Sequence, residues 1–176
     1  PELDKDFFLD LGMEGIETKE ALEKQLEENI KVRKEAEADN KYIDDLLIAA
    51  AKNTKIDIPE AMIEEEIDRI LKQYEENLKM QGITLEMFYQ FTNSDEQALR
   101  DQMKEEAKNR VTYRLMLEEI AKEEKIEVTD DEAETEAANL ATKYQMDKDE
   151  FLKLFGGLDM VKYDLKMRQA LEVLKK

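Results

Sequence analysis

Runs of adjacent carboxylates are the residues of this chain whose type could support catalysis or metal binding. Glu64-Glu65-Glu66 and Glu105-Glu106 supply the oxygen atoms that a general acid–base pair or a hard cation requires. Consecutive residues of a helix point in different directions around its axis, so these carboxylates do not converge on one point. We therefore expect a solvated acidic face that keeps the chain soluble, and the sequence predicts neither a catalytic residue nor a metal site.

The chain contains no cysteine and no histidine. Their absence excludes thiol nucleophiles, thiolate and imidazole zinc sites, histidine-dependent triads and the Glu-x-x-His pattern of di-iron helical bundles. The sequence also lacks a glycine-rich phosphate-binding loop. These absences predict a module that is not an enzyme and needs no cofactor.

The charge balance is strongly acidic. With 45 acidic and 27 basic residues the formal net charge is -18, and the basic residues are scattered among acidic neighbours, as in Glu23-Lys24. Such a surface repels phosphate backbones and anionic lipid headgroups. No apolar run approaches the ~18 residues of a membrane span. We therefore expect no direct nucleic-acid or membrane partner, and the start at Pro1-Glu2-Leu3-Asp4 predicts a fragment of a longer protein.

Apolar clusters with methionine and aromatic residues are the remaining candidates for function. The aromatic residues of the first cluster cannot all face one side of a short helix, so some apolar area should stay exposed. Methionine adapts to varied partners, which favours contact with many different peptides. The alternative is that the cluster only seals the end of a helical hairpin. Its predicted peptide-binding residues are Met80, Ile83, Leu85, Met87, Phe88, Tyr89 and Phe91.

A second apolar cluster follows about sixty residues later, and its consecutive apolar pairs again exceed what one helix face can bury. Here the alternative is that Gly156-Gly157 lets the next helix fold back and cover the cluster. The predicted peptide-binding residues are Met146, Phe151, Leu154, Phe155, Leu158 and Met160, with Leu152 beside them.

Helices must position these clusters, because only 5 glycines and 2 prolines interrupt a sequence rich in helix formers. A long helix is predicted from the Thr18 N-cap to about Asn53, roughly 50 Å in length. That length predicts an elongated body. Its expected inward stripe is Leu22, Leu26, Ile30, Ala36, Ile43, Leu47 and Ala50.

Two helical hairpins are predicted after the long helix. Pro59 opens a helix that ends before Gly82, Thr84 caps a short helix over residues 85–91, and a capping box at 94–97 opens a third helix to about Glu124. The expected buried faces are Ile63, Ile67, Ile70, Leu71, Tyr74 and Leu78, then Leu99, Met103, Val111, Leu115, Leu117 and Ile120.

The second hairpin repeats this plan, since Lys125-Ile126-Glu127-Val128 matches Lys55-Ile56-Asp57-Ile58 in type, 70 positions later. A capping box at 129–132 opens a helix, a short helix follows, and a last helix begins near Asp159. The expected faces are Ala133, Ala137, Leu140 and Tyr144, then Met160, Tyr163, Met167, Ala170, Leu171 and Leu174. The fold class is therefore all-α, with two hairpin arms on a long helix, a shape suited to holding a ligand between the arms.

The sequence resembles the C-terminal domain of trigger factor, a ribosome-associated bacterial chaperone. The similar stretches occur in order along the whole chain: Pro1–Asp4 with Phe7, Phe8 and Leu11-Gly12, Ile56–Asp68, Gln81–Leu85, Arg110-Val111, Leu117–Ala121 and Ile126–Asp130. The resemblance implies a single domain over 1–176, with the body and long helix at 1–58, arm 1 at 59–124, and arm 2 with the return to the body at 125–176.

The resemblance also implies a function: an ATP-independent cradle for unfolded or nascent polypeptides in the bacterial cytoplasm, assisting folding and export. The family's ribosome-binding and prolyl-isomerase domains have no counterpart here, so ribosome contact and isomerase activity would belong to the full-length protein. A weak homodimer is a further expected partner. Two alternatives stay open, a helical scaffold or dimerisation module with one defined partner, and the peptide-binding domain of an exported foldase or porin chaperone.

Overall fold

The computed structural model of the chain describes residues 18–176, which form seven helices and no strand. The helices are α2 (Lys19–Lys52), α3 (Glu60–Met80), α4 (Leu85–Thr92), α5 (Glu96–Glu123), α6 (Asp130–Lys143), α7 (Lys148–Phe155) and α8 (Leu158–Leu174). The predicted all-α class is confirmed. The apolar start at Phe7, Phe8 and Leu11 lies outside the described residues.

The chain divides into two units after Ile48. Among the described residues, the first unit holds only α2 up to Ile48. The second unit, Ala49–Lys176, holds the last residues of α2 and all of α3 to α8. The candidate peptide-binding residues all belong to the second unit.

The long helix α2 has its predicted bounds. Thr18 caps it, because the Ala21 amide donates to the Thr18 hydroxyl at 3.2 Å. The predicted inward stripe is wrong at Leu26 and Ile30, which are 47% and 45% exposed, and no residue of α2 is buried. The half-buried members of the stripe are Leu22, Ile43, Leu47 and Ala50. Within the described part of the first unit, α2 has no second helix against which to bury that stripe.

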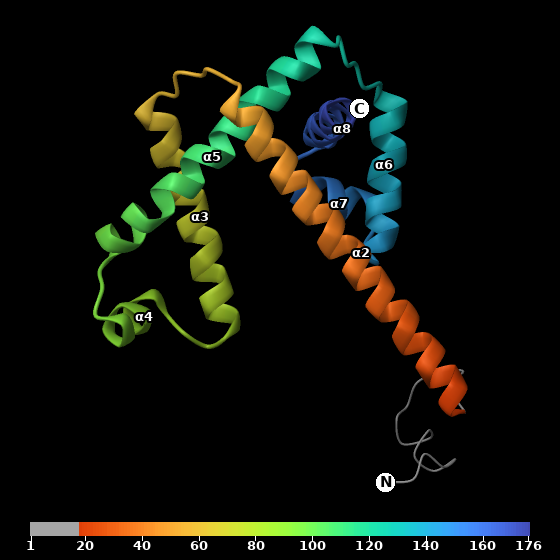
Figure 1. The fold of residues 1–176 in the computed structure, drawn as a ribbon, viewed down its shortest axis with the longest axis horizontal. Coiled ribbons are helices and arrows are strands. Elements are labelled where there is room, and N and C mark those ends of the chain that lie inside the picture. Colours follow the sequence, from red (N-terminus) through yellow and green to blue (C-terminus); the bar gives the residue numbers. More distant parts are fainter. Residues whose placement is uncertain (1–17) are drawn as a thin grey trace. The chain divides into compact units, whose positions relative to one another are not determined.

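Hairpin 1 consists of α3, α4 and α5, and α4 lies where the chain turns from α3 to α5 (Figure 1). Helix α3 ends at Met80, and Gly82 lies just past its end as predicted, with a φ of 75° that glycine adopts without strain. The helices α3 and α5 pack on each other along the predicted α3 face. The buried core is Ile63, Ile67, Ile70, Leu99, Met103 and Ala107.

The cap of α5 differs from the predicted capping box. Asp95 is the N-cap, and its carboxylate accepts from the Ala98 amide at 2.8 Å. The Ser94 hydroxyl instead lies 2.7 Å from the Thr92 hydroxyl, and Gln97 donates to Asp101 and not back to the cap. Asp95, which directly precedes the first helical residue, has the extended backbone that an N-cap requires.

Hairpin 2 consists of α6, α7 and α8. The predicted capping box is confirmed, because Thr129 and Glu132 each satisfy the other's backbone amide. The predicted stop is also confirmed, with Gly156 as the left-handed C-cap of α7. The buried core is Ala133, Ala137, Ala141, Phe151 and Val161.

The predicted face of α8 is confirmed in part, because Ala170 is fully buried, but other residues of α8 enter the core of hairpin 2. Val161 is buried and Leu165 packs against the core, whereas Met160 and Tyr163 are 47% and 37% exposed. Helix α8 is shared between two neighbours, since it packs on both α6 and α5. The ring of Tyr163 serves the second contact, because its hydroxyl donates to Glu118 of α5 at 2.6 Å.

Helix α5 likewise serves two neighbours, α3 and α8. Beyond the core of hairpin 1, it buries Val111, Met116 and Ala121. The predicted Leu115, Leu117 and Ile120 are only half-buried, so this end of the stripe is shifted around the helix. One continuous helix therefore joins the two hairpins.

One carboxylate of the predicted acidic face is not solvated. The Glu66 residue is 9% exposed, and its carboxylate lies 3.4 Å from Arg69, 3.9 Å from Arg110 and 3.7 Å from Arg114. Its neighbours Glu64 and Glu65 are exposed, as expected. A carboxylate enters a protein interior when cations compensate its charge, and the arginines of α5 do so here.

Candidate functional site

The first apolar cluster divides into exposed and packed residues around α4. Leu85, Phe88 and Tyr89 pack against the core of hairpin 1, and the Phe88 ring meets Tyr74 edge-on at 5.4 Å. Ile83 is half-buried. The other predicted residues project outward, with Met80 80%, Phe91 78% and Met87 40% exposed.

Local geometry explains this division. Helix α4 has only 8 residues, beginning at the Thr84 cap and ending at Asn93, whose φ of 50° is left-handed. Two turns of helix present only one side to α3 and α5, so the apolar residues on the opposite side stay in solvent. Part of the cluster therefore packs on the hairpin and part stays exposed, and Met80, Met87 and Phe91 form the exposed set.

The second cluster divides in the same way around α7. Phe151 is 5% exposed and belongs to the core, and Leu152 and Leu158 pack against it. Met146 is half-buried. The exposed members are Leu154 at 77%, Met160 at 47% and Phe155 at 36%.

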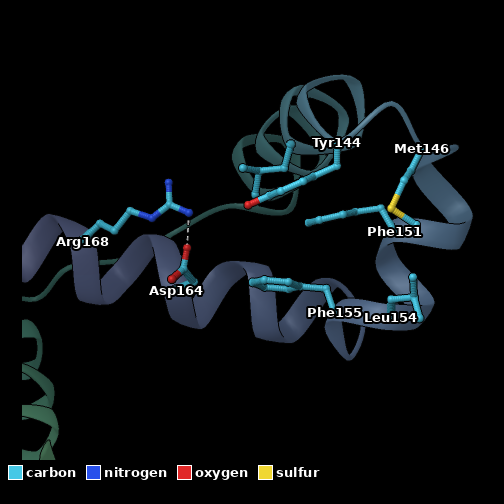
Figure 2. A pocket seen from close by; sticks show the side chains of 8 residues that line it. Tyr144, Met146, Phe151, Leu154, Phe155, Asp164 and Arg168 are labelled. Atoms are coloured by element: carbon cyan, nitrogen blue, oxygen red, sulfur yellow. Dashed lines mark ion pairs between the residues drawn. The ribbon is translucent and has the colours of Figure 1, made fainter. Parts of the chain in front are cut away.

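A groove of about 330 Å³ lies beside α7. The Tyr144 ring stacks near Phe151 at 6.3 Å, and Phe151 stacks on Phe155 at 5.2 Å. Figure 2 shows these rings stacked one above another, with Met146 and Leu154 on one side of the stack and Asp164 and Arg168 on the other. The lining residues are Leu140, Tyr144, Met146, Phe151, Leu154, Phe155, Asp164 and Arg168.

The charged end of this groove is internally compensated. Arg168 donates to Glu136 of α6 at 2.6 Å and forms an ion pair with Asp164 on its own helix. The rest of the lining is apolar or aromatic, so the groove suits an apolar side chain. The predicted burial of Tyr144 is wrong, because this residue is 61% exposed and lines the groove. The signal in the sequence is its position directly before the second cluster.

Two further grooves lie in the second unit, and neither was predicted from the sequence. One, of about 580 Å³, lies between the segment before α3 and the ends of α5 and α8, and its rim includes Lys55, Glu119, Glu123 and Glu124. The other, of about 480 Å³, lies on hairpin 1 between α3 and α5 and includes three amide side chains, Gln73, Asn77 and Gln102. Both need residues from helices far apart in sequence.

Residues 18–176 contain no cluster of three or more carboxylates able to hold a metal ion. In the same part of the chain, no helix has the length and apolar character needed to cross a membrane. The arrangement offers apolar surface and amide groups, and binding is the chemistry that such groups perform.

Comparison with known proteins places the chain in a family. The family model described as the C-terminus of bacterial trigger factor protein matches residues 17–176. Trigger factor of Bacillus subtilis is 42% identical over 174 residues, covering 99% of this chain and 41% of that protein. Trigger factor of Halalkalibacterium halodurans is 42% identical over 177 residues, with 99% and 41% covered.

The chain spans about two fifths of the length of these relatives. A solved structure of domains of trigger factor from Thermotoga maritima shares the fold, with a TM-score of 0.54 and 23% identity over 77% of this chain and 80% of that one. The family match covers every helix described above. The chain belongs to the trigger factor family and corresponds to its C-terminal part.

Proposed function

We propose that this chain is a chaperone domain that holds unfolded or nascent polypeptides through apolar surfaces at the turns of its two hairpins. The observation that carries the proposal is the exposure of large apolar side chains at both turns, Phe91 at 78% and Leu154 at 77%. Covering apolar side chains that are exposed to water lowers the free energy. Such side chains therefore favour unfolded chains, which expose apolar groups, over folded chains with polar surfaces.

The proposed binding residues are the exposed members of each cluster together with the groove beside α7. On hairpin 1 these are Met80, Met87 and Phe91, and on hairpin 2 they are Leu154, Phe155 and Met160. Methionine side chains adjust to differently shaped clients. Binding by burial requires no nucleotide, so the proposed activity is independent of ATP.

We propose that this activity takes place in the bacterial cytoplasm, and the match to bacterial trigger factor supports that proposal. Ribosome contact and prolyl isomerisation are proposed to belong to parts of the full-length protein other than this chain. A prolyl-isomerase assay on the purified chain tests the second point, and activity that stays with the chain through successive columns would contradict it.

The test of the proposed function is suppression of aggregation. Several unrelated unfolded proteins are diluted from denaturant with and without a modest excess of the chain, and light scattering is followed. We expect scattering to fall for all of them, in proportion to the chain added. Protection of a single protein would favour a scaffold with one partner, and protection of none would overturn the proposal.

A further inference from the structure

The groove between α3 and α5 of hairpin 1 carries hydrogen-bonding groups that the fold does not use. Gln73 and Asn77 of α3 and Gln102 of α5 line it, and all three are exposed. Within residues 18–176 none of the three side-chain amides makes a hydrogen bond. Each amide offers two donors and an accepting oxygen, so the groove presents both kinds of group.

The remaining lining is apolar and electrically neutral. Ile70, Leu99 and Met103 form buried parts of the lining, and Tyr74 and Phe88 are half-buried beside them. The only charged lining residues are Glu106 and Arg110, which pair with each other at 2.6 Å. On a chain with a net charge of -18 this neutral groove favours an uncharged polar ligand. The 580 Å³ groove has an acidic rim and therefore does not favour such a ligand.

The spacing of the amides matches one such ligand. Gln73 and Asn77 are four residues apart on α3, a rise of about 6 Å along the axis. In an extended polypeptide, main-chain groups on the same edge recur every second residue, at about 6.5 Å. Two successive amides of α3 can therefore meet two successive main-chain groups, while Gln102 approaches from α5.

We propose that this groove binds an extended segment of an unfolded polypeptide through its main chain, with Gln73, Asn77 and Gln102 as the hydrogen-bonding residues. This inference rests on the proposed function and adds a mode of recognition to it. Main-chain amides are the same for every residue except proline, and folded proteins pair most of theirs internally, so unpaired amides are concentrated in unfolded segments. The groove thus favours unfolded over folded chains, and this preference does not depend on the side chains of the bound segment.

Leucine substitutions separate main-chain hydrogen bonding from apolar burial, because the two mechanisms predict opposite signs. In the variant Gln73→Leu/Asn77→Leu/Gln102→Leu the groove gains apolar surface and loses its amides. We expect its Kd for a short, uncharged, terminally blocked peptide of Leu, Ala, Ser and Tyr to rise about ten-fold or more, since each net hydrogen bond is worth about two- to ten-fold. Fluorescence anisotropy of a labelled peptide measures this.

A matched control variant adds leucine elsewhere. Asn109, Asn139 and Gln169 are also exposed helical amides, and none of them lines a groove described above. The control is Asn109→Leu/Asn139→Leu/Gln169→Leu, which should bind the peptide as the unaltered chain does. A second peptide with alternate main-chain nitrogens methylated lacks half its donors and should bind the unaltered chain and the groove variant equally weakly.

The outcomes distinguish the inference from the proposed function. A groove variant that binds as tightly as the unaltered chain, or more tightly, overturns main-chain recognition, while peptide binding by the unaltered chain leaves the chaperone proposal standing. Loss of binding for the groove variant alone, together with insensitivity of that variant to N-methylation, supports the inference. If the unaltered chain neither binds the peptide nor suppresses aggregation, the proposed function fails and the inference fails with it.

Discussion

The two hairpins share one order of helices, but different side chains fill their cores. Residues 70 positions apart occupy equivalent places in their first helices, so buried Ile63 and Ile67 of α3 correspond to buried Ala133 and Ala137 of α6. Hairpin 1 fills its core with branched side chains from α3. Hairpin 2 combines small residues on α6 with one large ring, Phe151.

The ion pairs between helices also occur at positions 70 residues apart. Glu66 of α3 faces Arg110 and Arg114, and Glu136 of α6, 70 positions later, binds Arg168 at 2.6 Å. The short helices α4 and α7 are equivalent at an offset of 63 positions. At that offset Phe91 corresponds to Leu154, and each is more than three quarters exposed. The comparison teaches that the exposed apolar position is retained in both hairpins while the core beneath it changes.

The largest expected effect tests whether the two cores are interchangeable. Ile67→Ala removes a side chain that is 2% exposed and should lower the free energy of unfolding by about 2–5 kcal/mol through the cavity it leaves. The reciprocal Ala137→Ile should cost about 1–3 kcal/mol by overpacking, because Ala137 is fully buried. Chemical denaturation measures both. Tolerance of isoleucine at position 137 would contradict the difference between the cores.

Much of this architecture could be predicted from local sequence. Helix ends depend on Thr18, Pro59, Gly82 and similar residues, whose preferences act within a few positions. They predicted the bounds of α2 and α3, the starts of α4 and α6, and the end of α7. Burial of Glu66 could not be predicted, because its compensating arginines on α5 lie more than forty positions away. Capping and periodicity are local, whereas the cation beside a carboxylate is a consequence of tertiary packing.

The candidate site shows the same limit. The sequence predicted two apolar clusters, but only helix packing decides which members stay exposed, so Phe88 and Phe151 packed inward while Phe91 and Leu154 did not. Grooves between helices require the crossing of two elements. For that reason the amides Gln73 and Gln102, on α3 and α5, were not recognised as neighbours.

The next effect concerns how the hairpins begin. Hairpin 2 opens with the Thr129–Glu132 capping box, whereas α3 opens at Pro59 with no side-chain cap. Thr129→Ala should therefore cost about 0.5–2 kcal/mol, and Pro59→Ala should cost less than Thr129→Ala. Thermal unfolding measures the pair, and equal losses would mean that the cap does not distinguish the hairpins.

Glu132 adds a pH dependence to this cap. Hydrogen bonds from the Thr129 amide and hydroxyl hold the pKa of Glu132 below its usual value. The carboxylate therefore stabilises the fold at a pH above its unfolded pKa of about 4.5, and that contribution is lost as the pH falls through the lower folded pKa. Glu132→Gln should flatten this acid limb of stability, and an unchanged limb would contradict the assignment.

A smaller effect is expected at the contact that joins hairpin 2 to α5. Burial and the hydrogen bond to Glu118 raise the pKa of Tyr163 to about 12, because both disfavour the phenolate. Folding thus favours the neutral phenol. Its contribution is fully present below the unfolded pKa of about 10 and is lost as the pH rises through about 12.

Tyr163→Phe should remove this alkaline dependence, measured as the difference in unfolding midpoint between the variant and the unaltered chain across that window. Tyr42→Phe, at a ring that is 51% exposed on α2, is the matched control and should leave the dependence in place. A Tyr163→Phe profile that runs parallel to that of the unaltered chain would contradict a role for the hydroxyl in joining α8 to α5.

The smallest expected effect on stability is also the sharpest test of the equivalence of the two turns. Phe91 and Leu154 make few contacts within the chain, so Phe91→Ser and Leu154→Ser should each change the free energy of unfolding by no more than about 0.5 kcal/mol. If both turns contact clients, each change should lower aggregation suppression several-fold, because burying such a side chain contributes about 1.5–3 kcal/mol. The double variant should lose more than either single one. A variant that unfolds as readily as Ile67→Ala would place its residue in the core, and a variant that keeps full suppression would leave client binding to the other hairpin alone.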